Sequence, residues 1–322
     1  MRKRIIHYSI LLAVIIVVNF FLPRLLPGSP VGTLLGDDPG SMPAEEKMGI
    51  LAAYHLDKPL WEQFLLYLKD LFTLNWGDSY SKRQPIFQLI GAGVGWTVLL
   101  ATANLVISSV VGTVLGAVSA MKRKKRHDLP IVLGTTMVSS LPSFWVAIFL
   151  VAIFGVRLGW FPIYGAYSMW GEHTGLAAVG DVLWHMVLPV TTMVITSLMM
   201  FFTTSRFGVL NAINQDYVRM ARMRGIPNHR INLWYIMRNT MVPIFTIVMM
   251  DVGYLLSGSV LIETVFSYPG LGTLMYSAVS ARDYPLIQYC FLLSSFVTIL
   301  ALFLADTLYH KVDPLMEVAD AQ

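Results

Sequence analysis

The chain has 322 residues, of which 56% are hydrophobic and only 13% are charged. Ordinary soluble domains carry about 25% charged residues, so the composition excludes a soluble globule and indicates an integral membrane protein. The net charge of +4 does not indicate nucleic-acid binding, because the lysines and arginines cluster beside apolar segments as topology signals do. The single cysteine, Cys290, excludes an intrachain disulfide and a multi-cysteine metal site.

The N-terminal segment is predicted to be an uncleaved membrane span over residues 8–26. It has the basic start and the apolar run of a signal peptide, but no small-residue cleavage site follows. Arg2, Lys3 and Arg4 precede the span, and the positive-inside rule then places the N-terminus in the cytoplasm.

Residues 27–92 are mixed in charge, are interrupted by glycine and proline, and are predicted to form an external cap of short helices. Apolar side chains recur at helical spacing between Leu60 and Phe72. This periodicity favours an amphipathic helix that packs on the membrane domain over a substrate-binding segment.

A second span is predicted over residues 95–120, followed at residues 122–126 by a basic block that belongs in the cytoplasm. Small residues recur along this span at every fourth position, a pattern that lets helix backbones approach closely in lipid. They are Ser108, Gly112, Gly116 and Ala120. We therefore expect a close contact with a neighbouring helix.

The third and fourth spans are predicted at residues 129–154 and about 185–207, and Pro142 predicts a kink in the third. The fifth and sixth spans are predicted at about residues 241–266 and 286–308. The expected fold is an all-α membrane protein with six transmembrane helices, an external helical cap between the first two, and both termini cytoplasmic.

Several polar side chains within the predicted spans are candidates for lining a translocation path. A carboxylate as deep in the bilayer as Asp251 costs about 2.5–3.5 kcal/mol, so this side chain should face protein or water. Each candidate has an alternative role, since a polar side chain can also hydrogen-bond within its own helix or to a neighbouring one. The candidates are Asp251, Tyr254, Thr192, Thr196, Asn104 and Ser108.

A polar and basic segment at residues 208–240 separates the fourth and fifth spans and is predicted to be a cytoplasmic loop. On a helical wheel at about 100° per residue, Tyr217, Met220 and Ala221 share one apolar side, and Arg219 lies on the opposite side. The pattern predicts an amphipathic helix lying along a surface.

The end of this helix is predicted at Gly225, because the residue that follows a helix often adopts the left-handed conformation. Pro227 prevents simple continuation, and Asn228 is expected to cap a second helix over residues 229–241.

The order of residues in the basic segment resembles the cytoplasmic signature loop of permease subunits of binding-protein-dependent ABC importers. The matching residues are Asp216, Tyr217, Val218, Arg219, Ala221, Arg222 and Gly225, followed by Arg238, Asn239 and Pro243. The spacing from Gly225 to Pro243 is that of the peptide and nickel branch. Met220 and Thr240 depart from the small residues of the family pattern.

The resemblance extends beyond this loop. Ordered matches to the peptide permeases occur at residues 56–60, 141–145, 158–165, 263–272 and 282–285. The family implies one membrane domain over residues 1–322, located as a multi-pass protein in a bacterial or archaeal plasma membrane.

The resemblance also implies the partners and the role of the loop. The chain would pair with a second homologous permease, two ATP-binding subunits that hold ATP-Mg, and an external substrate-binding protein. Residues 216–225 would couple to the ATP-binding subunits, with Tyr217 and Ala221 as the knob and Arg219 and Arg222 as polar anchors. The chain itself has no G-x-x-x-x-G-K-[ST] phosphate loop, so we expect a non-catalytic subunit without a cofactor of its own.

Peptide import, of dipeptides or oligopeptides by alternating access, is the function that this resemblance favours. Nickel or another small solute is an alternative cargo for the same kind of permease. A different class of function is an ion-coupled secondary transporter that uses Asp251, although no inverted repeat is evident between the two halves of the chain.

Overall fold

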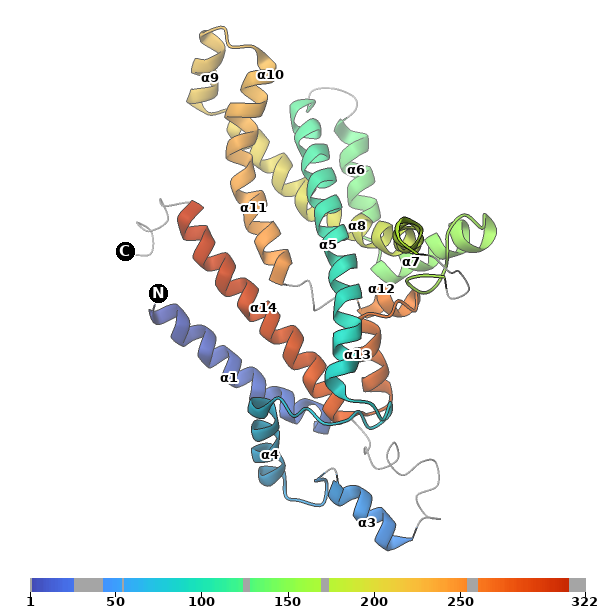
Figure 1. Ribbon diagram of the computed structural model, residues 1–322. Coiled ribbons are helices and arrows are strands. Elements are labelled where there is room, and N and C mark those ends of the chain that lie inside the picture. The colour runs from blue at the N-terminus through green and yellow to red at the C-terminus, as the bar shows by residue number, and fades with distance from the viewer. Residues whose placement is uncertain are drawn as a thin grey trace. The chain divides into compact units, whose positions relative to one another are not determined.

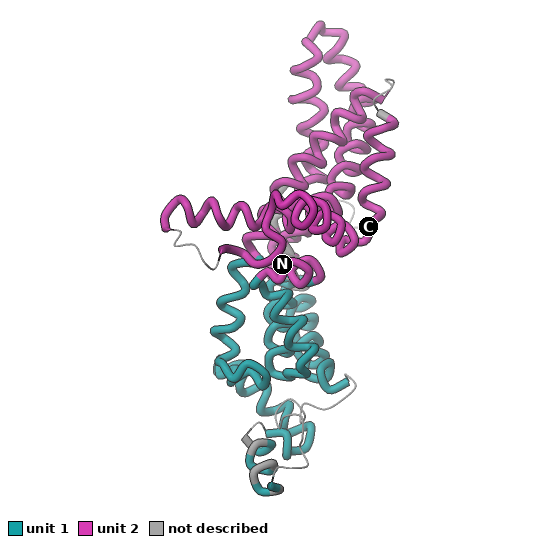
Figure 2. The backbone as a smooth tube through the Cα atoms, turned by 90° about the vertical axis from the view of Figure 1, so that its right-hand side faces the viewer, with its two compact units in different colours: residues 1–97, 256–260, 269–299 teal, residues 98–255, 261–268, 300–322 magenta. Residues whose placement is uncertain are grey.

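The computed structural model describes residues 2–25, 43–53, 55–123, 128–168, 174–253 and 260–312. In these ranges the chain is helical apart from turns, loops and one isolated β-bridge, between Asp78 and Pro85. It divides into two compact units, which Figure 2 shows in different colours. The all-α fold class predicted from the sequence is confirmed.

Unit 1 comprises Met1–Thr97, Leu256–Val260 and Pro269–Ile299. Its helices are α1 (Arg2–Leu25), α3 (Ala44–Ala53), α4 (Leu60–Thr73), the first part of α5 (Ile86–Met121), α13 (Leu271–Ser280) and most of α14 (Tyr284–Val312). Phe20 of α1 and Tyr67 of α4 are buried in its core with side chains from α5, α13 and α14. The Asn19 side-chain amide donates to the Gln288 carbonyl over 2.6 Å, which joins α1 to α14 (Figure 1).

Unit 2 comprises Val98–Leu255, Leu261–Tyr268 and Leu300–Gln322. Its helices are the rest of α5, α6 (Asp128–Ser139), α7 (Ser143–Leu150), η1 (Val151–Arg157), α8 (Leu176–Ile213), α9 (Asp216–Met223), α10 (Asn228–Arg230), η2 (Ile231–Met237), α11 (Arg238–Gly253) and nearly all of α12 (Val260–Val265). The long helix α8 contacts α6, α7, α11 and η2. It is therefore the central element of this unit.

The small-residue stripe of α5 packs against α8, as the sequence predicted. A Cβ atom at Gly116 would lie 2.3 Å from the Phe202 carbonyl oxygen, and one at Gly112 would lie 2.7 Å from the Phe201 Cβ. The Ser205 hydroxyl of α8 donates to the Thr113 carbonyl of α5 over 2.7 Å. The two backbones thus meet at a distance that only glycine permits.

Within the described residues, five helices are long and apolar enough to cross a membrane: Arg4–Leu25, Ile86–Met121, Leu176–Ile213, Asn228–Val252 and Tyr284–Leu304. A sixth span arises if the bent pair Leu129–Ser139 and Ser143–Arg157 counts as one. The pair bends by 97° at a break that contains Pro142, so the predicted kink is confirmed and is sharper than a bend within one helix.

Two predicted boundaries are wrong. The helix after the basic segment does not stop near residue 241, because α10, η2 and α11 follow one another without a break from Asn228 to Gly253. Pro227, in extended conformation, occupies the position before the first helical residue, so Asn228 is inside the helix and does not cap it. Proline is tolerated at the start of a helix because the N–H that it lacks would have no acceptor within the helix at this position.

The loop at residues 77–85, within the predicted cap, is fastened to the start of α14 by one buried carboxylate. Asp283 Oδ2 accepts hydrogen bonds from the Ser79 hydroxyl at 2.5 Å and from both the backbone nitrogen and the hydroxyl of Ser81 at 2.9 Å. Asp283 Oδ1 accepts from the Leu286 nitrogen at 3.2 Å, as a helix cap does. Residues 27–42 and 54 of the predicted cap lie outside the described residues.

Candidate functional site

The basic segment of unit 2 forms the short helix α9 between two sharp turns. Gln215 is extended, and its carbonyl accepts hydrogen bonds from the nitrogens of Val218 and Arg219. At the other end the Ile226 nitrogen donates to the Ala221 carbonyl, and Gly225 has a φ of 74°. Glycine adopts this left-handed backbone without the steric penalty that a Cβ would add.

The inner face of α9 is buried. Val218 and Ala221 are 0% and 3% exposed and pack in one apolar cluster with side chains of α5, α8 and η2. Tyr217 is half-buried at the edge of this cluster, and its hydroxyl accepts a hydrogen bond from the Asn239 amide at 2.9 Å. These contacts hold α9 against the long helices.

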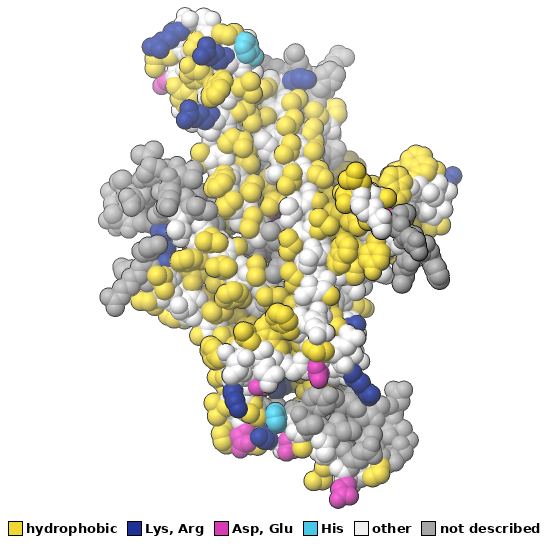
Figure 3. Space-filling model, in the orientation of Figure 1, with side chains coloured by type: hydrophobic (Ala, Val, Ile, Leu, Met, Phe, Trp, Pro, Cys, Tyr) yellow, Lys and Arg dark blue, Asp and Glu magenta, His cyan; other side chains and the backbone are white. Residues whose placement is uncertain are grey.

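The outer face of α9 carries Arg219, Met220, Arg222 and Met223, all exposed. Figure 3 shows lysine and arginine side chains gathered over the α9 and α10 end of unit 2. The ion pair from Arg219 to Asp216, at 3.7 Å, is exposed and contributes little to stability. The outer face therefore offers cations and flexible methionines, side chains that adapt to a partner's groove.

This arrangement differs from the predicted knob. Ala221 is buried inside unit 2 and Tyr217 is half-buried, so neither forms the exposed face. Met220, placed on the apolar side by the helical wheel, is 51% exposed. The wheel is right for the other residues, since Tyr217 and Ala221 lie on the buried side and Arg219 and Arg222 are exposed. Val218, not Met220, shares the buried face.

Three of the candidate path residues bond within their own helices. The hydroxyls of Ser108 and Thr192 are buried and donate to the Leu105 and Leu188 carbonyls at 3.4 and 2.9 Å. Thr196 donates to the Met193 carbonyl at 2.9 Å. Their hydrogen-bonding capacity is thus used locally, as the alternative role expects.

The remaining candidates are placed differently. The Asn104 side-chain amide donates to the Ser197 hydroxyl over 3.3 Å and so joins α5 to α8. Asp251 is half-buried in α11. Tyr254 lies outside the described residues. The structure brings Asn104 together with the threonine-bearing helix α8, and a role in transport for these residues stays a prediction.

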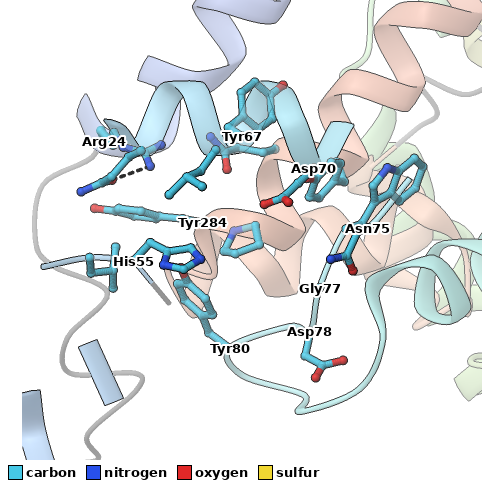
Figure 4. Close-up of a pocket in the computed structure, with 16 residues that line it drawn as sticks. Arg24, His55, Tyr67, Asp70, Asn75, Gly77, Asp78, Tyr80 and Tyr284 are labelled. Atoms are coloured by element: carbon cyan, nitrogen blue, oxygen red, sulfur yellow. Dashed lines mark hydrogen bonds between the residues drawn. The ribbon is translucent and has the colours of Figure 1, made fainter. Parts of the chain in front are cut away.

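Unit 1 contains a cavity of about 340 Å³ that the sequence did not predict (Figure 4). It lies between α4, the ends of α1 and α14, and the loops that flank α4. Its lining residues include Arg24, Gln63, Tyr67, Asp70, Trp76, Tyr80 and Tyr284. The sequence signal that was missed is Arg24, a cation at the end of an apolar span. It was interpreted as one of the charges that flank membrane spans and set their orientation.

Asp70, on α4, is half-buried in this cavity, and its burial raises the pKa of its carboxyl above the ordinary value, an effect that His55 and Lys69 partly oppose. An acid with a raised folded-state pKa destabilises the fold once it ionises, because the unfolded chain ionises at lower pH. Among the described residues, no cluster of three or more histidine, cysteine or acidic side chains is suited to a metal ion.

We therefore expect Asp70→Asn to raise the thermal stability of the full chain at pH 7 and to leave it unchanged near pH 3, where the wild-type carboxyl is protonated in both states. Unfolding of both proteins in detergent between pH 3 and pH 8 measures the difference. Asp57→Asn, at an exposed position, should show no such gap. A gap that grows toward low pH would contradict the sign of the effect.

The sequence matches the family described as binding-protein-dependent transport system inner membrane component over residues 112–318. It is similar to the di/tripeptide transport system permease protein DppB of Pseudomonas aeruginosa, with 32% identity over 314 residues that cover 92% of each chain. It is also similar to the dipeptide transport system permease protein DppB of Alkalihalophilus pseudofirmus, with 28% identity over 331 residues that cover 98% of this chain and 97% of the relative.

The family match covers more than half of the chain, including the basic segment with α9, and both relatives align over nearly their whole length. With its long apolar helices, the chain is a multi-pass protein of the plasma membrane. The chain belongs to the family of inner-membrane permease components of binding-protein-dependent transport systems.

Proposed function

We propose that this chain is one of two permease subunits of an ATP-driven importer of short peptides and works by alternating access. The observation that carries the proposal is the outer face of α9, a row of arginines and methionines on a helix whose inner face is locked into the long helices. A soluble energy-supplying partner needs such an exposed, firmly seated element. The peptide cargo is supported by the printed names of the two relatives.

The proposed assembly contains a second homologous permease, two ATP-binding subunits with ATP-Mg, and an external substrate-binding protein. The chain would form a single membrane domain over residues 1–322, with residues 27–92 outside the cell as a cap and residues 208–240 in the cytoplasm. The subunit contributes no catalytic residue and no cofactor of its own. Asp251, Asn104 and the other polar candidates are proposed to lie near the path.

Within the loop we assign two roles. Tyr217, Val218 and Ala221 seat α9, and Gly225 ends it; the exposed Asp216, Arg219 and Arg222, together with Met220 and Met223, contact the ATP-binding subunit. This division follows the burial of each side chain.

Reconstitution tests the proposed function directly. The chain, its partner permease and the two ATP-binding subunits are placed in proteoliposomes with the binding protein outside, and uptake of a labelled dipeptide is followed. ATP-dependent uptake that requires every component supports the proposal. Uptake by the lone chain, driven by an ion gradient, would instead establish a secondary transporter.

Gly225→Val is expected to separate ATP hydrolysis from uptake. The left-handed backbone at this position would cost a β-branched residue about 1–3 kcal/mol. In a fraction of the molecules, the C-terminal end of α9 would therefore leave its packed position. We expect the complex to assemble and to hydrolyse ATP while dipeptide uptake falls. Gly159→Val is the matched control, since Gly159 has a φ of 62°, open space around it, and a place outside the loop. Unchanged uptake in Gly225→Val would contradict the coupling role.

A further inference from the structure

The cation in the unit 1 cavity lacks a counterion within the described part of the chain. Arg24 donates to the Phe20 carbonyl and to the Gln63 side-chain oxygen, each over 2.8 Å, and its guanidinium lies 3.7 Å from the centre of the Phe20 ring. Both acceptors are neutral, and among the described residues no carboxylate lies within 4 Å of Arg24. A guanidinium has five N–H donors, so its remaining donors suit a carboxylate, which it can bind through two parallel hydrogen bonds.

The acid in the same cavity is Asp70. The residues that the structure describes supply its carboxylate with no hydrogen bond and with no cation within 4 Å. Burial without a partner is unfavourable for a carboxylate. An ammonium group that entered the cavity would restore the interactions that Asp70 loses on leaving water.

The groups that place the two charges lie at different points along α4. Gln63, which holds Arg24, and Asp70 are seven residues apart and so share one face of the helix. At 1.5 Å per residue, this interval is about 10 Å. An extended chain covers roughly 3.3–3.6 Å per residue, so a peptide of two or three residues is about as long as this interval. The head group of an ethanolamine phospholipid is shorter.

The wall between the charges is aromatic with polar tips (Figure 4). Trp76 stacks on Tyr289 with ring centres 4.8 Å apart, and the described residues offer no acceptor to its indole nitrogen. Burial raises the pKa of Tyr67 to about 12, so its hydroxyl stays protonated and can donate. These groups suit the carbonyls and the apolar side chains of a peptide, and 340 Å³ lies within the range of about 300–1,000 Å³ for small-molecule pockets.

We propose that this cavity binds a short peptide as a zwitterion, with the terminal carboxylate on Arg24 and the terminal ammonium on Asp70. The inference rests on the proposed function, because it gives the proposed cargo a binding site on this chain besides the polar candidates in the spans. The site would select free termini and tolerate varied side chains, since both charged contacts are made to groups that every peptide has.

The test uses the complete complex in phosphatidylcholine nanodiscs without the binding protein, and trialanine as the probe. Calorimetric titration compares trialanine with N-acetyl-trialanine and trialanine amide on the wild-type protein, so no variant needs to fold. Each blocked form should bind about ten- to a hundredfold more weakly, the loss expected for one charge-assisted contact. Equal affinity for the three peptides would overturn the proposal.

Variants of Asp70 and Arg24 show which residue binds which terminus of the peptide. Asp70→Asn should weaken trialanine but leave N-acetyl-trialanine unchanged, whereas Arg24→Gln should weaken trialanine but leave trialanine amide unchanged. Asp57→Asn and Arg83→Gln, both exposed and outside the cavity, are the matched controls and should bind as the wild type does. Asp70→Asn is also expected to be the more stable protein, so lost binding there cannot be ascribed to unfolding.

Three further outcomes distinguish a peptide site from a lipid site and from the import activity of the complex. If trialanine fails to bind and phosphatidylethanolamine, added to the nanodiscs, binds in a manner that Asp70→Asn abolishes, the cavity is a lipid site and the proposal is overturned. If the complex imports dipeptide but binds no peptide in the absence of the binding protein, the inference fails while the proposed function stands. If it imports no peptide at all, the proposed function fails first.

Discussion

Gly116→Ala is expected to prevent α5 from packing on α8, although the change adds a single methyl group. The new carbon would lie 2.3 Å from the Phe202 carbonyl oxygen and 2.9 Å from the Ser205 Cβ. The first of these atoms belongs to the backbone of a long helix and cannot move aside alone. Overpacking of a tight interior costs roughly 1–3 kcal/mol or more, and here the hydrogen bond from Ser205 to Thr113 would be lost with the contact.

The matched control for this change lies in the same helix. Gly95 is exposed, and a Cβ there would meet no atom within 4 Å. Because alanine is a better helix former than glycine by about 1 kcal/mol, Gly95→Ala should leave stability unchanged or raise it. The midpoint of thermal unfolding and the yield of monodisperse protein in detergent measure both variants. Equal stability of the two would show that α5 and α8 can separate without cost.

Asp283→Ala should release the loop at residues 77–85 from the start of α14. The Asp283 carboxylate accepts four hydrogen bonds, and its removal would leave the buried Ser79 hydroxyl without its acceptor. Each unsatisfied buried group costs about 1–3 kcal/mol, and hydrogen bonds to a charged group are among the stronger ones. We expect a loss of several kcal/mol that is confined to unit 1.

Limited proteolysis measures this release. Arg83 and Lys82 lie in the loop and are exposed, so trypsin should cut there much faster in Asp283→Ala than in the wild type. Asp57→Ala, a change of the same kind at an exposed position, should be cut at the wild-type rate. Asp283→Asn tests whether the charge and both oxygens are needed. It keeps one acceptor oxygen but replaces the other with an NH2 group, which would face N–H or O–H groups that are donors themselves. Unchanged cleavage in Asp283→Ala would show that the carboxylate does not hold the loop.

Features that depend on local pattern were predictable from the sequence. Apolar runs of about 20 residues marked the spans, the four-residue repeat around Gly116 marked the tight contact, and Pro142 marked the break in the third span. Gly225 marked the end of α9. Each of these signals acts over a few turns of one helix, where composition and spacing decide the conformation.

Features that depend on contacts between distant segments were not predictable. Ser79 and Asp283 are 204 positions apart, so no spacing rule links them. Arg24 and Gln63 meet only because α1 and α4 pack together. The exposure of Met220 was missed for the same reason, because an apolar residue at the border of the buried face is covered only where a neighbouring helix reaches it.

The packing of α9 also determines how rigidly the basic segment is connected to the long helices α5 and α8. Val218 and Ala221 lie in one buried cluster with alanines of α5 and α8, including Ala117 and Ala212. Alanine has no side-chain rotamers through which such a contact could yield, and close-packed interiors transmit strain because they are hardly compressible. A force on the exposed arginines and methionines of α9 would therefore reach the ends of α5 and α8 as movement of whole helices, with little absorbed in between.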